Sequence, residues 1–369
     1  MKSPLKVLVF SFFICANLSW SQSSDSFYEH YTGLISEELK LTADLIKSHN
    51  DFTGFYYYEF KEDGVWITSK PIALDGRVDE QNNFVLNEFG DYSSFFQGHL
   101  DNSKLITGEW INKNLGEPVQ FTLKATYAQG SIPLNLSVYQ SSKLFDDQIG
   151  NPNAEFNISL LFPNAQLDEA VYHQLLDRIY YYIGYRGKSQ NQKDILSQLE
   201  DRYYQQFQSS LANIKLDSFP ETFNWSKNIR MDVINNESGL LCLQFETYAK
   251  TGDRDGTLVR KYLVFSLKEN KVLKIEDVFK EESISQLESL LEKKLRQNYR
   301  IDDEAPLSSV GFFQDSIPVT KNFYLHPGGI GFYYNVFEIA PQSTGSSDVF
   351  IPFSEIQAFL KPEVQSFFR

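Results

Sequence analysis

Between Gly54 and Tyr127 the chain is divided into short aromatic or β-branched runs by Gly, Asn and Asp. Short runs separated by such turn residues are typical of antiparallel hairpins. Three glycines, Gly54, Gly76 and Gly98, recur at a spacing of 22 residues, and each begins a strand, turn and strand pattern. We therefore predict a β-meander over residues 51–128, in which the glycines provide bulges or positive φ angles where the sheet bends.

The segment before the meander has a different pattern. Over residues 34–49 the apolar side chains are spaced as on one face of a helix, with Ser36 placed to cap its start. We predict an amphipathic helix there, within an N-terminal helical segment of residues 22–50.

The rest of the chain, residues 129–369, contains strands and helices in separate groups. A strand ends at Pro163, and a helical pattern continues to about Leu211 with a break between Gly184 and Gly187, which gives two helices or one interrupted helix. Further strands are expected at 228–235, 240–249, 257–267, 322–325, 329–335 and 349–351, with a helix at 283–299. Segregated strands and helices favour an α+β class, with antiparallel sheets packed against helices and preceded by the meander module.

The N-terminus has the features of a secretory signal peptide. Lys2 and Lys6 accompany an apolar run of about a dozen residues, and Ser19 and Ser21 stand at the small-residue positions before a cleavage at Gln22. The run is too short to span a bilayer, so we predict cleavage of residues 1–21, no stable membrane insertion, and a secreted or periplasmic location. Bulky residues before Cys15 argue against lipidation.

Charge and cysteine content narrow the function. The formal net charge is −14, and removal of Lys2 and Lys6 makes it more negative. Nucleic acids are therefore excluded as partners, because their phosphates require clustered Lys and Arg, whereas a cationic protein would be attracted. Acidity also serves solubility alone. Without Cys15 only Cys242 remains, in an apolar strand-like run, and we predict a buried structural thiol.

Catalytic motifs are not evident. The five histidines do not have the spacing of a zinc site, and no Gly-x-Ser-x-Gly sequence is present, so we predict no metal, no cofactor and, on balance, no enzyme. His326 precedes a Pro-Gly-Gly turn, which explains it structurally. Glu338 would have a raised pKa if buried, or would pin its loop by hydrogen bonds. A glycosidase needs only two carboxylates, which sequence alone does not locate.

The C-terminal block is the most diagnostic part of the chain. It contains Asn322-Phe-Tyr-Leu, Gly331-Phe-Tyr-Tyr-Asn, Glu338-Ile-Ala-Pro341, Gly345 and Ile351-Pro-Phe-Ser-Glu-Ile, after Tyr262-Leu-Val-Phe-Ser-Leu and Lys274-Ile-Glu-Asp-Val-Phe279. This order resembles the extracytoplasmic C-terminal domain shared by RsiV-type anti-sigma factors and some peptidoglycan or polysaccharide deacetylases, a domain of unknown function. The resemblance covers about residues 150–365.

The resemblance implies binding rather than catalysis. In the anti-sigma factors this domain binds lysozyme, and in the deacetylases it accompanies a separate metal-dependent catalytic domain, which is not recognised in this sequence. We expect a non-enzymatic binding module at the bacterial cell envelope, recognising a cationic protein such as lysozyme, or peptidoglycan or another glycan. The alternatives are a hydrolase that acts on envelope polysaccharide through carboxylates, and a structural envelope protein. The binding candidates are Tyr324, Tyr333, Tyr334, Glu338, Pro341 and Gly345.

Overall fold

The structure is a computed structural model that describes residues 26–36, 39–90, 94–114, 116–128, 130–164, 166–189, 191–214, 220–252, 255–365 and 367. The predicted signal peptide, with Cys15, lies outside the described residues. Among the helices in these ranges, none is long and apolar enough to cross a membrane.

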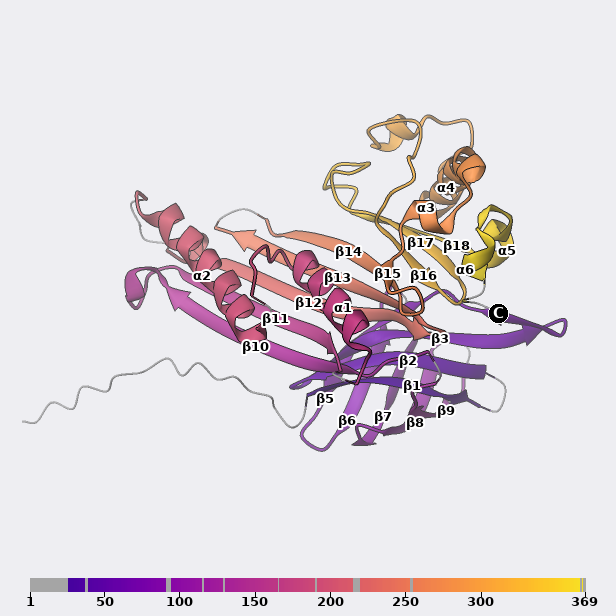
Figure 1. Ribbon diagram of the computed structural model, residues 1–369, viewed down its shortest axis with the longest axis horizontal. Coiled ribbons are helices and arrows are strands. Elements are labelled where there is room, and N and C mark those ends of the chain that lie inside the picture. Colours follow the sequence, from indigo (N-terminus) through magenta and orange to yellow (C-terminus); the bar gives the residue numbers. More distant parts are fainter. Residues whose placement is uncertain are drawn as a thin grey trace, which may run out of the picture.

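The N-terminal part of the described chain is a closed antiparallel barrel, shown in indigo and purple in Figure 1. Sequence neighbours pair throughout, and the sheet closes because the first strand also pairs with the last. The closing strands are β1 (Phe27–Ile35), β2 (Leu39–Ser48), β3 (Asp51–Glu62), β5 (Ile72–Val78), β6 (Asn83–Glu88), β7 (Ser94–Asn102), β8 (Leu105–Asn112) and β9 (Val119–Ala125). The short β4 (Val65–Thr68) extends a hairpin with β3.

Glycines allow the barrel strands to bend closely over one another. A Cβ atom on Gly76 would lie 1.8 Å from the Val85 carbonyl oxygen, and one on Gly98 would lie 2.2 Å from that of Thr107. Gly54 has a φ of 153°, but Gly76 and Gly98 do not have positive φ. The prediction of positive φ therefore holds at Gly54 alone, and close approach of the neighbouring backbone is the reason for glycine at Gly76 and Gly98.

The barrel interior is filled by apolar side chains. They come from alternate positions of every closing strand and leave a cavity of only about 10 Å³. That space is about the size of one water molecule, so the barrel is a packed core that holds no ligand.

The predicted helix over residues 34–49 is wrong, because this segment forms the end of β1 and all of β2. Leu41 and Leu45 point into the barrel at the period of a strand, whereas Ile46 on the opposite side packs into the core of the neighbouring sheet. A strand with apolar residues on both faces has no clear alternation, and its apolar spacing imitates that of a helix.

A six-stranded sheet follows the barrel. Its order is β10 (Leu134–Leu144), β11 (Asn153–Pro163), β12 (Trp225–Glu237), β13 (Leu240–Thr251), β14 (Thr257–Ser266) and β15 (Lys271–Val272). All neighbours are antiparallel except β11 and β12, which are parallel because the intervening chain crosses over as two helices.

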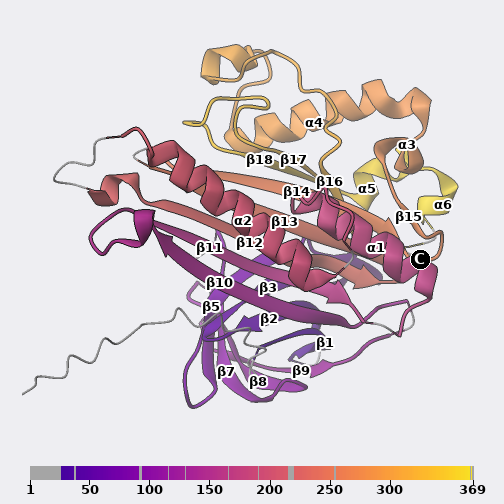
Figure 2. The same cartoon turned by 60° about the vertical axis from the view of Figure 1, so that its left-hand side comes forward.

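The crossover helices, α1 (Glu169–Tyr182) and α2 (Gln192–Leu211), cover one face of the sheet (Figure 2). They begin at capping side chains, Asp168 and Asn191, each of which accepts hydrogen bonds from two backbone amides. Their buried residues pack with apolar residues of β11 to β14, such as Phe156 against Tyr203.

A smaller sheet and helix lie against the opposite face of β12 to β14. The sheet consists of β16 (Phe323–His326), β17 (Gly329–Tyr334) and β18 (Ser347–Pro352), backed by α4 (Ile284–Tyr299). The short helices α3 (Ile275–Val278), α5 (Phe353–Ile356) and α6 (Pro362–Gln365) complete this part.

The predicted α+β class is confirmed, with helices packed on sheets after an N-terminal β module. The break near Gly184 gives two helices, as one of the two interpretations expected. β10 was missed, because its exposed edge carries Ser, Asn, Gln and Lys and so reads as a linker.

Candidate functional site

A deep groove separates the barrel from the face of the six-stranded sheet that the helices leave free. It consists of two adjoining cavities of about 920 Å³ and 750 Å³, which share Asp75 and Asn87 of the barrel and Arg230 of the sheet. The smaller, inner cavity also reaches the sheet formed by β16 to β18. Either volume is of the size that ligand sites have, and we call the whole the barrel–sheet groove.

The floor of the groove is built from cross-strand rows of polar side chains. Because side chains alternate between the two faces of a strand, the residues that point away from α1 and α2 line up across the sheet. The register gives an uncharged row of Gln140, Asn157 and Asn228, in which the Asn157 amide donates to the Asn228 Oδ1 atom at 2.8 Å.

The next row carries alternating charges. Arg230, Glu246 and Arg260 are cross-strand partners on β12, β13 and β14. The Arg260 Nε atom donates to Glu246 Oε2 at 2.8 Å, and Arg230 Nη2 lies 3.7 Å from Glu246 Oε1. Each guanidinium is therefore held by a carboxylate that is itself fixed on the sheet.

The third row is buried more deeply. Asp232 is only 1% exposed, and its Oδ2 atom accepts hydrogen bonds from Arg230 Nε at 3.0 Å and Gln244 Nε2 at 3.3 Å. Its Oδ1 atom has no hydrogen-bond partner in the part of the chain that the structure describes. Burial raises the pKa of Asp232, against the opposing effect of the Arg230 charge.

Asp348 of β18 stands at the inner end of the groove. Both of its carboxylate oxygens accept from the Tyr324 hydroxyl, at 3.2 Å each. The side chain has accessible surface, but protein surrounds it on the groove walls. This environment raises the pKa of Asp348 to about 6, although the Tyr324 hydrogen bond and the charges of Lys70 and Arg260 act in the opposite direction.

Two of the six sequence-predicted site residues line this inner end. The rings of Tyr324 and Tyr333 pack against Tyr262, with centroids 4.9 Å and 5.7 Å away, and Arg260 lies over the Tyr333 ring. Tyr333 is 2% exposed, and its hydroxyl donates to Ser346 in the groove wall. The tyrosine rings therefore pack beside the charged row and contact it through Arg260.

The other four candidates lie elsewhere. Tyr334 follows Tyr333 in the same strand and so points to the opposite face, where its hydroxyl donates to the Pro318 carbonyl. Glu338 is exposed and accepts from the Asn335 side chain, which pins the start of the loop between β17 and β18. The remaining two, Pro341 and Gly345, lie in turns of that loop.

Next to Glu338, Phe337 has a φ of 67° and a side chain that is 59% exposed. Positive φ is rare and strained for an aromatic residue. Phe313 is 53% exposed, and its amide donates to the Ile339 carbonyl of the same loop. We call these two exposed aromatic residues the loop patch, and neither lines the groove.

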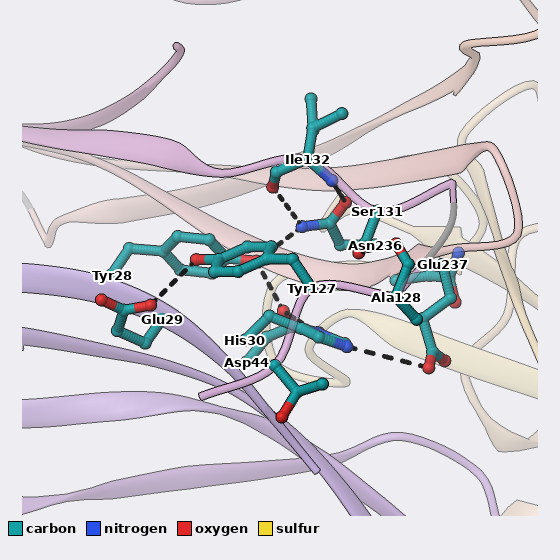
Figure 3. A network of polar contacts seen from close by, with 12 residues as sticks. Tyr28, Glu29, His30, Asp44, Tyr127, Ala128, Ser131, Ile132, Asn236 and Glu237 are labelled. Carbon is teal, nitrogen blue, oxygen red and sulfur yellow. Dashed lines mark hydrogen bonds and ion pairs between the residues drawn. The ribbon is translucent and has the colours of Figure 1, made fainter. Parts of the chain in front are cut away.

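A buried polar network fixes the barrel to the sheet and so sets the groove walls (Figure 3). His30 of β1 is fully buried, with Nδ1 2.9 Å from Asp44 Oδ1 and Nε2 3.7 Å from Glu237 Oε1. Asn236 bonds both the Tyr28 hydroxyl, which itself donates to Asp44, and the backbone of Ile132.

Two charge effects act within this network. Burial alone would lower the pKa of His30, but the carboxylates of Asp44 and Glu237 outweigh it and raise that pKa. Burial also raises the pKa of Glu237, although the Tyr57 hydroxyl donates to it. Both shifts favour the protonated form of the group concerned.

Two residues singled out in the sequence prove structural. His326 is fully buried at the turn into β17, where burial lowers its pKa to about 3 and the Gly328 amide donates to its Nδ1 atom. Cys242 is buried as predicted, and burial raises its pKa to about 12. Within the described ranges, His, Cys, Asp and Glu form no group of three that could hold a metal ion.

The polar side chains of the groove floor leave a recognisable pattern in the sequence. Residues 228–233, Asn-Ile-Arg-Met-Asp-Val, alternate strictly between polar and apolar, and Gln244 with Glu246 continues the pattern on the next strand. Such alternation marks a strand with one wet face. The partners from β10, the barrel and β18 become visible only in three dimensions.

Comparison with known proteins gives a family for part of the chain. Residues 276–354 match the model of a family described as "Protein of unknown function (DUF3298)". This region is a DUF3298 domain. It runs from α3 into α5, and so contributes Tyr324, Tyr333 and Asp348 to the groove. No curated protein matches the chain.

Two solved structures match part of this chain. A DUF3298 family member from Bacteroides fragilis has a TM-score of 0.55 at 20% identity and covers 65% of this chain and 99% of its own. A DUF3298 family protein from Pseudomonas aeruginosa has a TM-score of 0.46 at 20% identity and covers 64% of this chain and 97% of its own. At this identity the first likeness concerns the fold alone, and about a third of the chain has no counterpart there.

Proposed function

We propose that this protein is a secreted or periplasmic binding protein that holds a cell-envelope glycan in the barrel–sheet groove. The observation that carries the proposal is the groove floor, where polar side chains stand in cross-strand register over three rows. Sugar hydroxyls and amides are both donors and acceptors, and amide side chains such as Asn157 and Asn228 have the same double capacity. An open groove between two elements also accepts a long chain, whereas a closed pocket would accept only its end.

Calorimetric titration with an N-acetylglucosamine hexamer at physiological salt tests this proposal, using the chain without residues 1–21. We expect saturable binding at one site. Replacement of both floor amides, Asn157→Ala with Asn228→Ala, is expected to weaken binding about tenfold or more, because each lost hydrogen bond contributes about 1 kcal/mol. Gln120→Ala removes an exposed amide on the outside of the barrel and is expected to leave the affinity unchanged.

A second candidate function is recognition of a basic protein such as lysozyme, which the sequence resemblance suggests. The loop patch supports it, because Phe313 and Phe337 are exposed next to the acidic Glu338 on a chain of net charge −14. Lysozyme binding that persists at physiological salt, survives the floor variants and is lost in Phe337→Ser with Phe313→Ser would favour this candidate. If lysozyme binds in this way and the glycan does not bind, the glycan proposal is wrong.

The same titration samples test for hydrolysis. Asp348 has the raised pKa of a general acid, and the groove holds other carboxylates. A binding protein leaves the hexamer intact, so that no new reducing ends form during prolonged incubation. Steady release of shorter oligomers that stops in Asp348→Asn would show a hydrolase instead.

A further inference from the structure

The inner cavity has carboxylates that the protein itself does not neutralise. Five acidic residues line it, Asp75, Glu88, Asp232, Glu246 and Asp348, together with three basic residues, Lys70, Arg230 and Arg260. The two arginines are already bound to Asp232 and Glu246, and Glu88 accepts from the Tyr56 and Trp110 side chains. Among the described residues, the carboxylates without a basic partner are therefore Asp348, Asp75 and Glu88, and Asp232 has one oxygen atom free.

Asp348 has little compensation of its charge from the residues around it. It accepts from one neutral hydroxyl and forms no salt bridge with any Lys or Arg of the described residues. Its side chain is open to the groove, and the surrounding groove walls raise its pKa. Asp232, which lines the same cavity, has an oxygen atom that lacks a hydrogen-bond partner within the described part of the chain. Positively charged donors in this cavity would relieve such groups.

A lysine of the protein itself lies in the same cavity as Asp348 and would compete with a bound cation. Lys70 leads out of the β3–β4 hairpin, lines the inner cavity and lowers the pKa of Asp348 through its charge. Its side chain is exposed and flexible, so it can turn away to solvent when another cation occupies the site. The structure thus contains both the acceptor of a cation and the group that a bound cation would displace.

We propose that the inner end of the barrel–sheet groove binds a primary ammonium group, with Asp348 as its acceptor and Lys70 as the group that it displaces. This inference rests on the proposed glycan-binding function and refines it, because it selects glycans with free amino groups over fully N-acetylated ones. Ligand charge of this sign also agrees with the net charge of −14.

The test compares a glucosamine hexamer with an N-acetylglucosamine hexamer, at pH 6.5 and physiological salt. At this pH most Asp348 is ionised, and a large share of the glucosamine amino groups is protonated. We expect the glucosamine hexamer to bind about tenfold more tightly than the acetylated hexamer. At pH 5 the preference should shrink to about twofold or less, because Asp348 becomes protonated, even though the ligand becomes more cationic.

Two variants with opposite expected signs make the test specific. Asp348→Asn, which keeps the size of the side chain and its bond with Tyr324, is expected to abolish the preference at pH 6.5 and its change with pH. Lys70→Gln is expected to tighten glucosamine binding several-fold by removing the competitor. Asp63→Asn is the control for Asp348→Asn, because it also removes one negative charge, but at the exposed turn between β3 and β4. It should leave the preference for the glucosamine hexamer unchanged.

Contrary outcomes are distinguishable. If Lys70→Gln weakens binding and Asp348→Asn strengthens it, the ligand group is anionic and the proposal is wrong. Equal binding of both hexamers, unaffected by Asp348→Asn, would leave the glycan groove in place and remove the ammonium site. A lysine hexamer that binds more tightly than the glucosamine hexamer and depends equally on Asp348 would show that a peptide supplies the ammonium group, which contradicts the glycan source. Absence of binding to either sugar would overturn the proposed function itself.

Discussion

Single residues determine how tightly the barrel strands can coil. Gly76 has no positive φ, yet a Cβ atom there would collide with the backbone of β6 at Val85. Backbone cannot yield as a flexible side chain would, so the strands would have to separate. The 22-residue spacing of glycines in the sequence thus records the places where one barrel strand crosses closely over the next.

Gly76→Ala is therefore expected to lower the free energy of unfolding by about 3 kcal/mol, the upper range for overpacking a close contact. Urea denaturation followed by fluorescence measures the change. The neighbouring Asp75→Ala, on an exposed side chain of the same strand, is expected to shift stability by less than about 0.5 kcal/mol. Equal stability of Gly76→Ala and the wild type would show that the strands have room to separate.

Among the elements, the strands and helices of the C-terminal part were predicted from sequence close to their observed bounds. Residues 169–182 and 192–211 bury apolar side chains at helical spacing on one face only, and Asn191 caps the second helix by accepting from two backbone amides. β2 was predicted as a helix because it is the reverse case, an element buried on both sides. The difference lies in tertiary burial, which periodicity within one element does not contain.

Removal of this cap provides a local test. Asn191→Ala is expected to destabilise the protein by about 1 kcal/mol, because two amides at the start of α2 lose their acceptor. Asn191→Asp keeps an oxygen acceptor and should retain most of the stability. Thermal unfolding of the three proteins under identical conditions distinguishes the cap from a general effect of substitution.

For the whole molecule, the relation between barrel and sheet depends on polar groups that sequence did not single out. His30 was noted only as one of five scattered histidines, and its partners Asp44 and Glu237 are 14 and 207 positions away along the chain. Contacts of this range leave no periodic pattern. The groove is a similar case. The alternation on β12 predicts a polar face, but the opposite wall comes from the barrel and is not indicated by that pattern.

The buried histidine makes stability depend on pH. His30 has a raised pKa in the folded protein, so its contribution is complete below the unfolded value of about 6.5 and is lost as pH rises through the folded value. The groups that face it are Asp44, Glu237 and the Tyr127 ring. Glu237 also has a raised pKa, so by the same sign its contribution is complete below about 4.5 and is lost as the pH rises above that value.

We expect the free energy of unfolding to fall between pH 6.5 and pH 8.5 by about 1.4 kcal/mol for each unit by which the His30 pKa is raised. His30→Gln, which has no titrating group, should be less stable at pH 6 but show a nearly flat profile in this range. Urea titrations at five pH values measure both curves. If His30→Gln loses stability with rising pH as steeply as the wild type, the pH dependence comes from another group.

The barrel closes by pairing its first strand with its last, and this has a consequence for how the chain is made. Synthesis proceeds from the N-terminus, and the hairpins from β2 to β8 can each form as soon as their two strands exist. β1 must wait for β9, about ninety residues later, before its outer edge is paired. During that interval the growing chain presents an unpaired strand edge, the kind of surface to which other chains add strands, so a chaperone that shields nascent edges would have its main task here.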